Sequence, residues 1–519
     1  MGVSGRYKLV ALLAVVLVAT TAPAAATSPS LRATVQALRA VNAFRESVQP
    51  SSTSPGIRGS WSQKGIDYAR EIAVGIISAS VKKVTLPDIK FDKDSISGEI
   101  TNLVCDDFKV LSSKSTLEAG TGIALGASIA VSCSADWNYR ENIWPHIPHG
   151  SGSVDLATSS SSLDVSIGVI TVDQKPNVKA LSCAANVDIT TLDFHGGLTG
   201  DILNLFKGLI KDHIHSAMDT DLCNTFDSVV SGAFNKVLDS FTYSLMLDLP
   251  GAFNISTAKF GLMDTPVVAS DYVGVNLQGE VVNRDHPATP PFSPNPLPTF
   301  DASDADHMLQ LYISRYVFNT GAWVFFEAGL EKIVITPAMV PSSFPFKLNT
   351  SDPTFSSIAP GMAQKYPDTG VELLFASTSY PSVNGNTSVA NLTAPVSISF
   401  AAATSPSPSF AFELACTIVG GLTADIQGQL LIGQLTELQC PLTLVKSDVG
   451  TVDVAGLSML VSSVLNSVAL PAANKILAKG FPIPTLEGVE FVNSQLNFGD
   501  GYVELATDLK FDTLEQLMA

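Results

Sequence analysis

The sequence predicts an α+β protein of two pseudo-duplicated lobes, and three observations favour this class. A helical pattern, a series of strands and a second helical pattern precede a proline-rich segment, and the same order returns after it. The strands alternate apolar with small residues, which is typical of antiparallel sheets. Charged residues make up only 15% of the chain, against about 25% in average globular proteins, so much apolar surface has to be buried.

The first lobe is predicted to begin with an amphipathic helix over residues 63–84 and to end with another over residues 201–218. In both segments, apolar residues three or four positions apart share one helical face. We expect four of these residues to belong to the core or to line a pocket: Ile66, Ile76, Leu205 and Leu209.

Three segments between these helices have the period of two expected of β-strands. In residues 122–133 most odd positions are apolar, while the even positions are glycine, alanine or serine. Residues 163–169 and 181–189 alternate in the same way. The glycines near residue 122 therefore belong to a strand, and no Lys-Ser/Thr pair follows them as a phosphate-binding loop requires.

The second lobe follows a segment of unusual composition. Residues 283–300 contain six prolines and are predicted to form an extended linker. After the linker, a helix is predicted over residues 304–316, strands fill the region to Lys446, and a helix fits residues 454–477. The repeated order is the reason for predicting a duplicated architecture.

The N-terminus has the features of a secretory signal peptide. Arg6 and Lys8 precede an apolar run over residues 9–18, which is too short to span a bilayer. We expect residues 1–26 to be removed and residues 27–54 to form a tail, and we predict a secreted, extracellular protein. Four sequons predict N-glycosylation at surface positions: Asn254, Asn349, Asn386 and Asn391.

All six cysteines follow the predicted signal peptide. An even number of cysteines in a secreted chain indicates disulfide bonds. Zinc binding is the weaker interpretation, since no two cysteines have the close C-x-x-C spacing of a zinc site. Six cysteines allow fifteen pairings, and their spacing alone does not choose among them.

The sequence argues against several classes of function. It has no G-x-S-x-G elbow, no H-E-x-x-H helix and no P-loop, so we predict neither an enzyme nor a catalytic residue. His146 and His149 form an H-x-x-H on a loop, but no carboxylate or cysteine follows at a useful spacing, so we predict no metal site. The net charge of −18 disfavours nucleic acid as a partner.

Several segments resemble one protein family. Residues 54–89, SPGIRGSWSQKGIDYAREIAVGIISASVKKVTLPDI, are similar to the start of the mature domain in the lipid-transfer and lipopolysaccharide-binding family, which includes bactericidal permeability-increasing protein and the plasma lipid transfer proteins. The linker motif TPPFSP, the segment RYVFNTGAWVFFEAG at residues 315–329, and two later segments also match. The later ones are IGQLTELQCPLTLVKSDVG and LPAANKILAKGFPIPTLEGVEF. The resemblance extends over about residues 55–512 in the family's order.

The resemblance implies a boomerang of two antiparallel β-barrels, each wrapped round a long helix and joined by a central sheet. It also implies an apolar lipid pocket under each barrel, and therefore no cofactor other than a bound phospholipid or similar lipid. The implied domains are an N-terminal barrel at 55–245, central-sheet strands and linker at 246–300, a C-terminal barrel at 301–490, and a return strand with a tail at 491–519.

The resemblance places Cys183 and Cys223 where the family has the disulfide of its N-terminal lobe. Proximity within the predicted strands then pairs the other four cysteines, and three bonds are predicted: Cys105–Cys133, Cys183–Cys223 and Cys416–Cys440.

The aromatic segment SADWNYRENIWPHIPHG, residues 134–150, lies between two predicted strands at the end of a long hairpin. Trp and Tyr favour the headgroup boundary of a bilayer, so Trp137, Tyr139 and Trp144 are predicted to contact membranes or lipid particles. The alternative is that these side chains fold back and cap the barrel end, because Trp is usually highly buried.

We therefore predict a secreted lipid-binding protein that holds phospholipid-like amphiphiles and transfers them or presents them at membrane surfaces. The alternative is a lipopolysaccharide-binding, antibacterial protein. In the antibacterial members the corresponding hairpin end is rich in lysine, whereas this chain has only Arg140 there, next to Glu141. The acidic net charge also weakens binding to anionic microbial surfaces.

Overall fold

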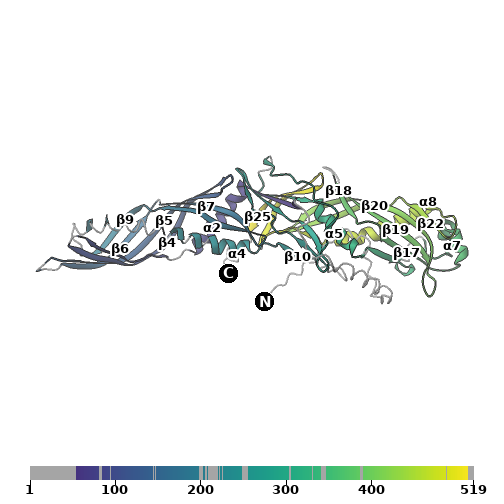
Figure 1. Cartoon of the computed structure of the whole chain (residues 1–519), viewed down its shortest axis with the longest axis horizontal. Coiled ribbons are helices and arrows are strands. Elements are labelled where there is room, and N and C mark those ends of the chain that lie inside the picture. The colour runs from purple at the N-terminus through teal and green to yellow at the C-terminus, as the bar shows by residue number, and fades with distance from the viewer. Residues whose placement is uncertain are drawn as a thin grey trace.

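The computed structural model describes residues 54–511 apart from short gaps, which are residues 81–83, 94, 144, 146–147, 160, 198–202, 205–206, 209–219, 221, 225, 229, 248–254, 303–305, 330, 341–345, 386–389 and 487. Two lobes lie at opposite ends of an elongated molecule, and a third sheet lies between them (Figure 1). The predicted signal peptide and N-terminal tail lie outside the described residues.

The N-terminal lobe is one antiparallel sheet, as the alternation in the sequence predicts. Its strands run in the order β2-β4-β5-β6-β9, while β7 joins β5 to β8 and β3 pairs with β4. The odd residues of β5 from Ile129 to Tyr139 are buried, and the even residues between them are more exposed. The bounds are β2 Val84–Thr85, β3 Ile89–Lys93, β4 Ile96–Glu118, β5 Gly122–Glu141, β6 His149–Thr158, β7 Ser161–Val172, β8 Lys175–Asn186 and β9 Ile189–Gly196.

Helix α2, Gln63–Ser80, packs against β4 and begins at the predicted residue. The Ser115 hydroxyl donates to the Asp67 carboxylate at 2.5 Å, and the Arg70 guanidinium donates to the Ser113 carbonyl oxygen at 2.9 Å. The second predicted helix, residues 201–218, falls mostly in the gaps. C-terminal to these gaps the chain is helical, and the π-helix η2, Val230–Phe234, leads into α4, Asn235–Leu238.

The central sheet is built from both ends of the chain. Its order is β12-β13-β1-β15-β25-β24, so strands of the first lobe pair directly with strands of the second. The small sheet β10-β11-β14 completes the middle region. The bounds are β1 Ile57–Ser62, β10 Ser244–Leu247, β11 Ser256–Lys259, β12 Val267–Val268, β13 Tyr272–Leu277, β14 Glu280–Asn283, β15 Leu309–Ser314, β24 Val489–Gly499 and β25 Tyr502–Phe511.

The helix predicted over residues 304–316 is wrong. Residues Leu309–Ser314 form β15 in the middle of the central sheet, and all six are buried. A strand that is covered on both faces lacks the alternation of apolar and polar residues by which a strand is recognised. Even the polar Gln310 is buried, and its side-chain amide forms two hydrogen bonds of 2.8 Å with the backbone of Asp301. Helix α5, Arg315–Glu327, begins at the end of the predicted range. It coincides with residues 315–329, the segment RYVFNTGAWVFFEAG that resembles the family.

The C-terminal lobe is a second antiparallel sheet, in the order β16-β17-β19-β20-β21-β23 with β18 beside β19 and β22 beside β20. The bounds are β16 Lys332–Ile335, β17 Val371–Ser377, β18 Ser382–Gly385, β19 Ala390–Ala402, β20 Ser409–Gln427, β21 Leu430–Gln439, β22 Thr443–Ser447 and β23 Phe481–Pro482. The short helices of this lobe are η4 Pro337–Met339, α6 Pro353–Ile358 and α7 Pro360–Lys365.

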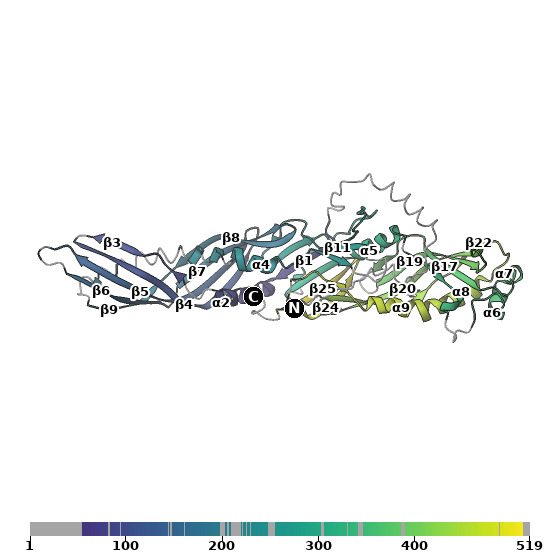
Figure 2. The ribbon, with the colours of Figure 1, turned by 90° about the horizontal axis from the view of Figure 1, so that it is seen from below.

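The helix predicted over residues 454–477 is confirmed. It consists of α8, Val454–Val464, the π-turn η5, Leu465–Ala469, and α9, Leu470–Leu477, and lies along one side of the lobe (Figure 2). By length and composition this helix could cross a membrane. Leu457, Leu460 and their neighbours pack into the apolar core instead, so we interpret it as a core helix.

The proline-rich linker is held against the central sheet. The Arg58 guanidinium on β1 donates to the carbonyl oxygens of Leu297 and Pro298 at 2.9 and 3.1 Å, and to the Asn276 side chain at 3.0 Å. The Phe292 ring of the linker stacks on Tyr380 with a centroid distance of 5.0 Å. These contacts hold the linker along a defined path on the protein.

All three predicted disulfides are confirmed. Cys105–Cys133 joins β4 to β5, Cys183–Cys223 joins β8 to a helical segment, and Cys416–Cys440 joins β20 to the end of β21. The predicted class is confirmed as well: the protein is α+β, with two antiparallel lobes joined by a central sheet.

Candidate functional site

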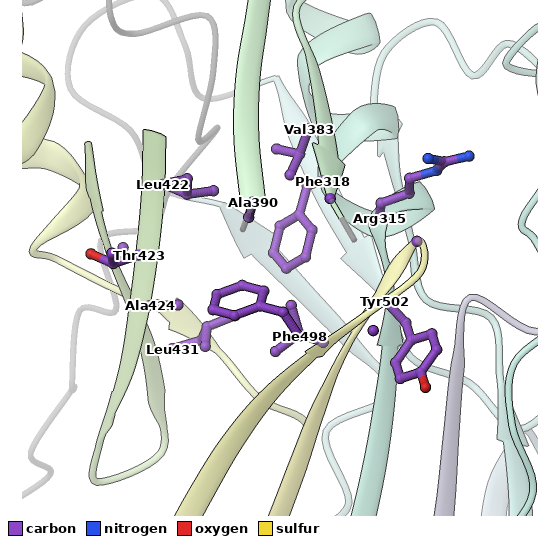
Figure 3. Close-up of a pocket in the computed structure, with 15 residues that line it drawn as sticks. Arg315, Phe318, Val383, Ala390, Leu422, Thr423, Ala424, Leu431, Phe498 and Tyr502 are labelled. Atoms are coloured by element: carbon purple, nitrogen blue, oxygen red, sulfur yellow. The ribbon is translucent and has the colours of Figure 1, made fainter. Parts of the chain in front are cut away.

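A cavity lies where the C-terminal lobe meets the central sheet (Figure 3). It holds about 560 Å³ of empty space, part of which is open to solvent. Phe318 of α5, Leu422 of β20, Leu431 of β21 and Phe498 of β24 converge on it. Its lining is almost entirely apolar.

Local structure positions the two aromatic side chains of the cavity, Phe318 and Phe498. Ser314 caps the first turn of α5 by accepting a hydrogen bond from the Tyr316 N–H at 3.1 Å, which sets where the helix begins and where Phe318 points. Phe498 precedes the tight β24–β25 turn, in which Gly501 has a φ of +81°. The turn places the ends of β24 and β25 at the cavity, beside Arg315, the first residue of α5.

Small residues create the empty space. Gly385, Ala390, Ala424 and Gly433 line the cavity where larger side chains would fill it. A Cβ placed on Gly433 would meet Leu477 and Leu422 at 3.7 and 3.8 Å, which is ordinary van der Waals contact. The position therefore accepts a side chain without a backbone clash, and that side chain would occupy the cavity.

Polar groups are confined to the edge of this lining. Among the described residues that line the cavity, Arg315 is the only charged one, and Thr423 and Tyr502 supply the hydroxyls. Burial raises the pKa of the Tyr502 phenol, and Glu504 nearby raises it further, so this group is neutral. Figure 3 shows the Arg315 guanidinium and the Tyr502 ring directed away from the central cluster of rings.

Of the four residues predicted to belong to the core or to line a pocket, only Ile66 has a described side chain, and it is not among the residues that line this cavity. Ile66 is half-buried and packs against Leu117, Val268 and Val273, where the first lobe meets the central sheet. The side chains of Ile76, Leu205 and Leu209 lie outside the described residues. The pocket residues were missed because their small and aromatic side chains come from distant strands and have no common spacing.

Trp137 and Tyr139 are not positioned to contact a membrane. Their exposed fractions are 1% and 5%, and the Trp137 indole N–H donates to the Ser153 carbonyl oxygen at 2.9 Å. A Cβ on Gly152 or Gly196 would come within 3 Å of the indole, so these glycines make room for it. The predicted membrane contact is thus corrected for these two residues, whose burial matches the alternative of capping the barrel end.

The alternation of β5 could have revealed this burial. Ala135, Trp137 and Tyr139 continue the odd positions of Ile129 and Val131, which face the core. Trp144 lies outside the described residues, so its predicted membrane contact stays a prediction.

The predicted glycosylation sites are only partly described. Asn254 and Asn386 lie outside the described residues. Asn349 is half-buried, and its side-chain oxygen accepts from the backbone N–H and the hydroxyl of Ser351 at 2.8 Å each. Asn391 lies on β19 with its residue half-buried, opposite Gly421 of β20.

Comparison with known proteins gives the family. The N-terminal-domain model of the LBP / BPI / CETP family matches residues 65–233, and the C-terminal-domain model matches residues 254–511. The chain belongs to the LBP / BPI / CETP family. Both halves of the family's architecture are present in their usual order, which agrees with the resemblance read from the sequence.

Individual members of the LBP / BPI / CETP family resemble the chain over most of its length. Bactericidal permeability-increasing protein of Sebastes schlegelii is 27% identical over 470 residues, which are 89% of this chain and 96% of that protein. Lipopolysaccharide-binding protein of Homo sapiens is 24% identical over 470 residues, 88% of this chain and 94% of that protein. The crystal structure of lipopolysaccharide binding protein matches with a TM-score of 0.58 at 22% identity, covering 89% of this chain and 100% of that chain, which shows the shared fold.

Proposed function

We propose that this protein is a secreted carrier that binds a phospholipid-like amphiphile in the cavity of its C-terminal lobe. The observation that carries the proposal is the almost purely apolar lining of a cavity in a chain of this family. Burying an acyl chain gains about 0.8 kcal/mol per CH₂, so such a cavity binds tails without needing charged groups inside.

The carrier then exchanges its lipid at a membrane or lipid-particle surface. Trp144 is the aromatic residue of the hairpin loop that remains a candidate for this contact, because Trp137 and Tyr139 are buried. The predicted signal peptide and the four sequons support an extracellular, glycosylated protein. No catalytic step is part of the proposal.

A second candidate function is lipopolysaccharide binding, which the names of the relatives favour. At the β4–β5 end of the N-terminal lobe, Lys90 faces Glu99 with 3.9 Å between the amine and the carboxylate, and Arg140 adjoins Glu141. Opposite charges beside one another give no net positive potential for anionic polysaccharide. The apolar cavity therefore supports the carrier proposal better.

Mass spectrometry of lipids extracted from the purified secreted protein tests the proposal directly, beside a protein-free control. We expect stoichiometric bound phospholipid, or uptake when the protein is incubated with vesicles. Absence of bound lipid together with no uptake would refute the carrier proposal.

A pair of variants localises the binding site. Gly433→Phe places a ring in the cavity and should abolish uptake by the C-terminal lobe. Gln434→Phe is the matched control, because Gln434 is the next residue of β21, is exposed and points to the opposite face. Equal uptake by both variants would place the lipid elsewhere.

A further inference from the structure

We propose that Asn384–Gly385 is a site of spontaneous deamidation, and that the isoaspartate formed there displaces the part of β18 that lines the C-terminal cavity. The pair is the only Asn-Gly dipeptide in the 519-residue sequence. The covalent change requires nothing of the proposed function, whereas its effect on lipid uptake rests on that function.

The first observation is the accessibility of the asparagine. Asn384 is exposed, and it lies on β18 between Val383 and Gly385, which both line the cavity. Successive side chains of a strand point to opposite faces, so the Asn384 side chain lies on the outer surface of the lobe. Its amide donates to the hydroxyls of Ser382 and Thr393 at 3.2 and 3.3 Å. Both bonds are long for an N–H···O contact, so they hold the amide weakly.

The second observation is the direction of the Gly385 N–H. In an antiparallel pair, the backbone groups of successive residues point alternately toward the partner strand and away from it. The Val383 N–H donates to the Asn319 side chain of α5 at 2.9 Å, so it points away from β19. Gly385, two residues further on, has the same direction, and its pairing with Ala390 is the last of β18. The nitrogen that attacks the Asn384 side chain is therefore not bonded to β19.

The third observation is the position of the dipeptide at the end of a strand. Gly385 has no side chain to obstruct the approach of its own nitrogen to the Asn384 side chain, and it rotates more freely than any other residue. β18 ends at Gly385. The rotation that brings the two groups together therefore disrupts only the last part of the ladder, where strands open most readily.

The reaction needs water and no other reactant. The Gly385 nitrogen loses its proton and forms a bond to Asn384 Cγ, while the bond from Cγ to Nδ2 breaks and the side-chain nitrogen leaves as ammonia with that proton. Water then opens the resulting succinimide at one of its two carbonyl carbons. Attack at Cγ gives aspartate, and attack at the main-chain carbonyl carbon gives isoaspartate.

The two products differ in their effect on the cavity. Aspartate keeps the backbone of β18, and its carboxylate accepts hydrogen bonds from the hydroxyls of Ser382 and Thr393. Isoaspartate routes the chain through the former side chain and adds one methylene to the backbone. Because the faces of a strand alternate with a period of two residues, Gly385 then loses either its pairing with Ala390 or its place in the lining.

Peptide mapping by mass spectrometry tests the covalent change. The purified full-length protein is incubated at mildly alkaline pH, with a mildly acidic sample in parallel, because the deprotonated Gly385 nitrogen is the attacking group. We expect Asn384 to convert progressively in the alkaline sample, with isoaspartate detected by isoaspartyl methyltransferase. Asn497 is the internal control, since it is an exposed strand residue that precedes cavity-lining Phe498 rather than a glycine. Persistence of Asn384, or equal conversion of Asn384 and Asn497, would overturn the proposal.

Uptake of lipid from phosphatidylcholine vesicles tests the effect on the cavity. We expect the fractional loss of uptake during incubation to equal the fraction of chains with isoaspartate at position 384. Asn384→Gln should keep its uptake throughout, because its longer side chain does not close the five-membered succinimide. Asn384→Asp should take up as much lipid as the fresh parent protein, since it carries the product with an unaltered backbone.

The outcomes separate this inference from the function beside which it stands. Hydrogen exchange reports the displacement without any lipid, and we expect faster exchange in β18 and the facing part of β19 once isoaspartate has formed. Unchanged exchange and uptake in chains that contain isoaspartate would refute the displacement. Absence of uptake by the fresh parent protein would refute the carrier proposal instead, while peptide mapping and hydrogen exchange would still decide this one.

Discussion

The side-chain amide of Asn474 and the backbone of Leu435 form a reciprocal pair. The amide donates to the Leu435 carbonyl oxygen at 2.9 Å and accepts from the Leu435 N–H at 2.7 Å. Asn466 binds the backbone of Leu438 in the same manner, and Asn235 of the N-terminal lobe binds Val178. In each lobe, helical asparagines thus supply the hydrogen bonds that a neighbouring strand would otherwise supply.

This pairing predicts that Asn474→Ala destabilises the protein. The change leaves both backbone groups of Leu435 without their partners at a buried residue, and each unsatisfied group costs about 1–3 kcal/mol. Urea unfolding should therefore show a loss of a few kcal/mol. Asn497→Ala on the exposed side of β24 is the matched control; equal stabilities of the two variants would contradict the role given to the amide.

A second prediction concerns Glu331, which precedes β16 and is only 3% exposed. Neither carboxyl oxygen has a hydrogen-bond partner among the described residues. Burial raises the pKa of Glu331 to about 8, and the nearby Ser377 hydroxyl lowers it by a smaller amount. The carboxyl is therefore neutral in the folded protein at physiological pH.

The folded protein keeps this proton between pH 4.5 and about 8, while the unfolded chain has released it. Stability should consequently fall as pH rises through this window, by up to about 1.4 kcal/mol per pH unit. Glu331→Gln should remove that slope when unfolding free energies are measured across the window. Glu437→Gln, at an exposed residue of β21, is the control, and an unchanged slope in Glu331→Gln would disprove the assignment.

A third prediction separates the two tryptophans of the aromatic segment. Trp137→Ala should cost about 3–5 kcal/mol of stability, as removal of a buried aromatic ring does, and Trp137→Phe should cost less. Trp137→Phe should leave binding to phospholipid vesicles unchanged in flotation assays, because the indole is buried. Trp144→Ala should lower vesicle binding with little loss of stability. The reverse pattern would restore Trp137 as the membrane contact.

Predictions from the sequence succeeded where a single segment carries its own pattern. The alternation of β5, the apolar face of α2 and the long helix from Val454 to Leu477 all depend on neighbouring residues, and all three elements are present. The prediction for residues 304–316 failed at β15, because burial on both faces of that strand removes the alternation.

The candidate site was harder to predict than the fold. Trp137 illustrates one reason, because its assignment to a membrane surface from residue type ignored the register of β5, in which the odd residues from Ile129 to Tyr139 are buried. The cavity illustrates another, since Phe318 and Phe498 are 180 positions apart in the chain and meet only when β24 and β25 return to the central sheet.

The sequence by itself determined the α+β class, the duplicated lobes and the family, because periodicity and motif order are properties of contiguous residues. Only the tertiary structure decided which side chains enclose the cavity. The reason is physical: a cavity is the space that small residues such as Gly433 leave between distant elements, and the packing of those elements against one another fixes its position.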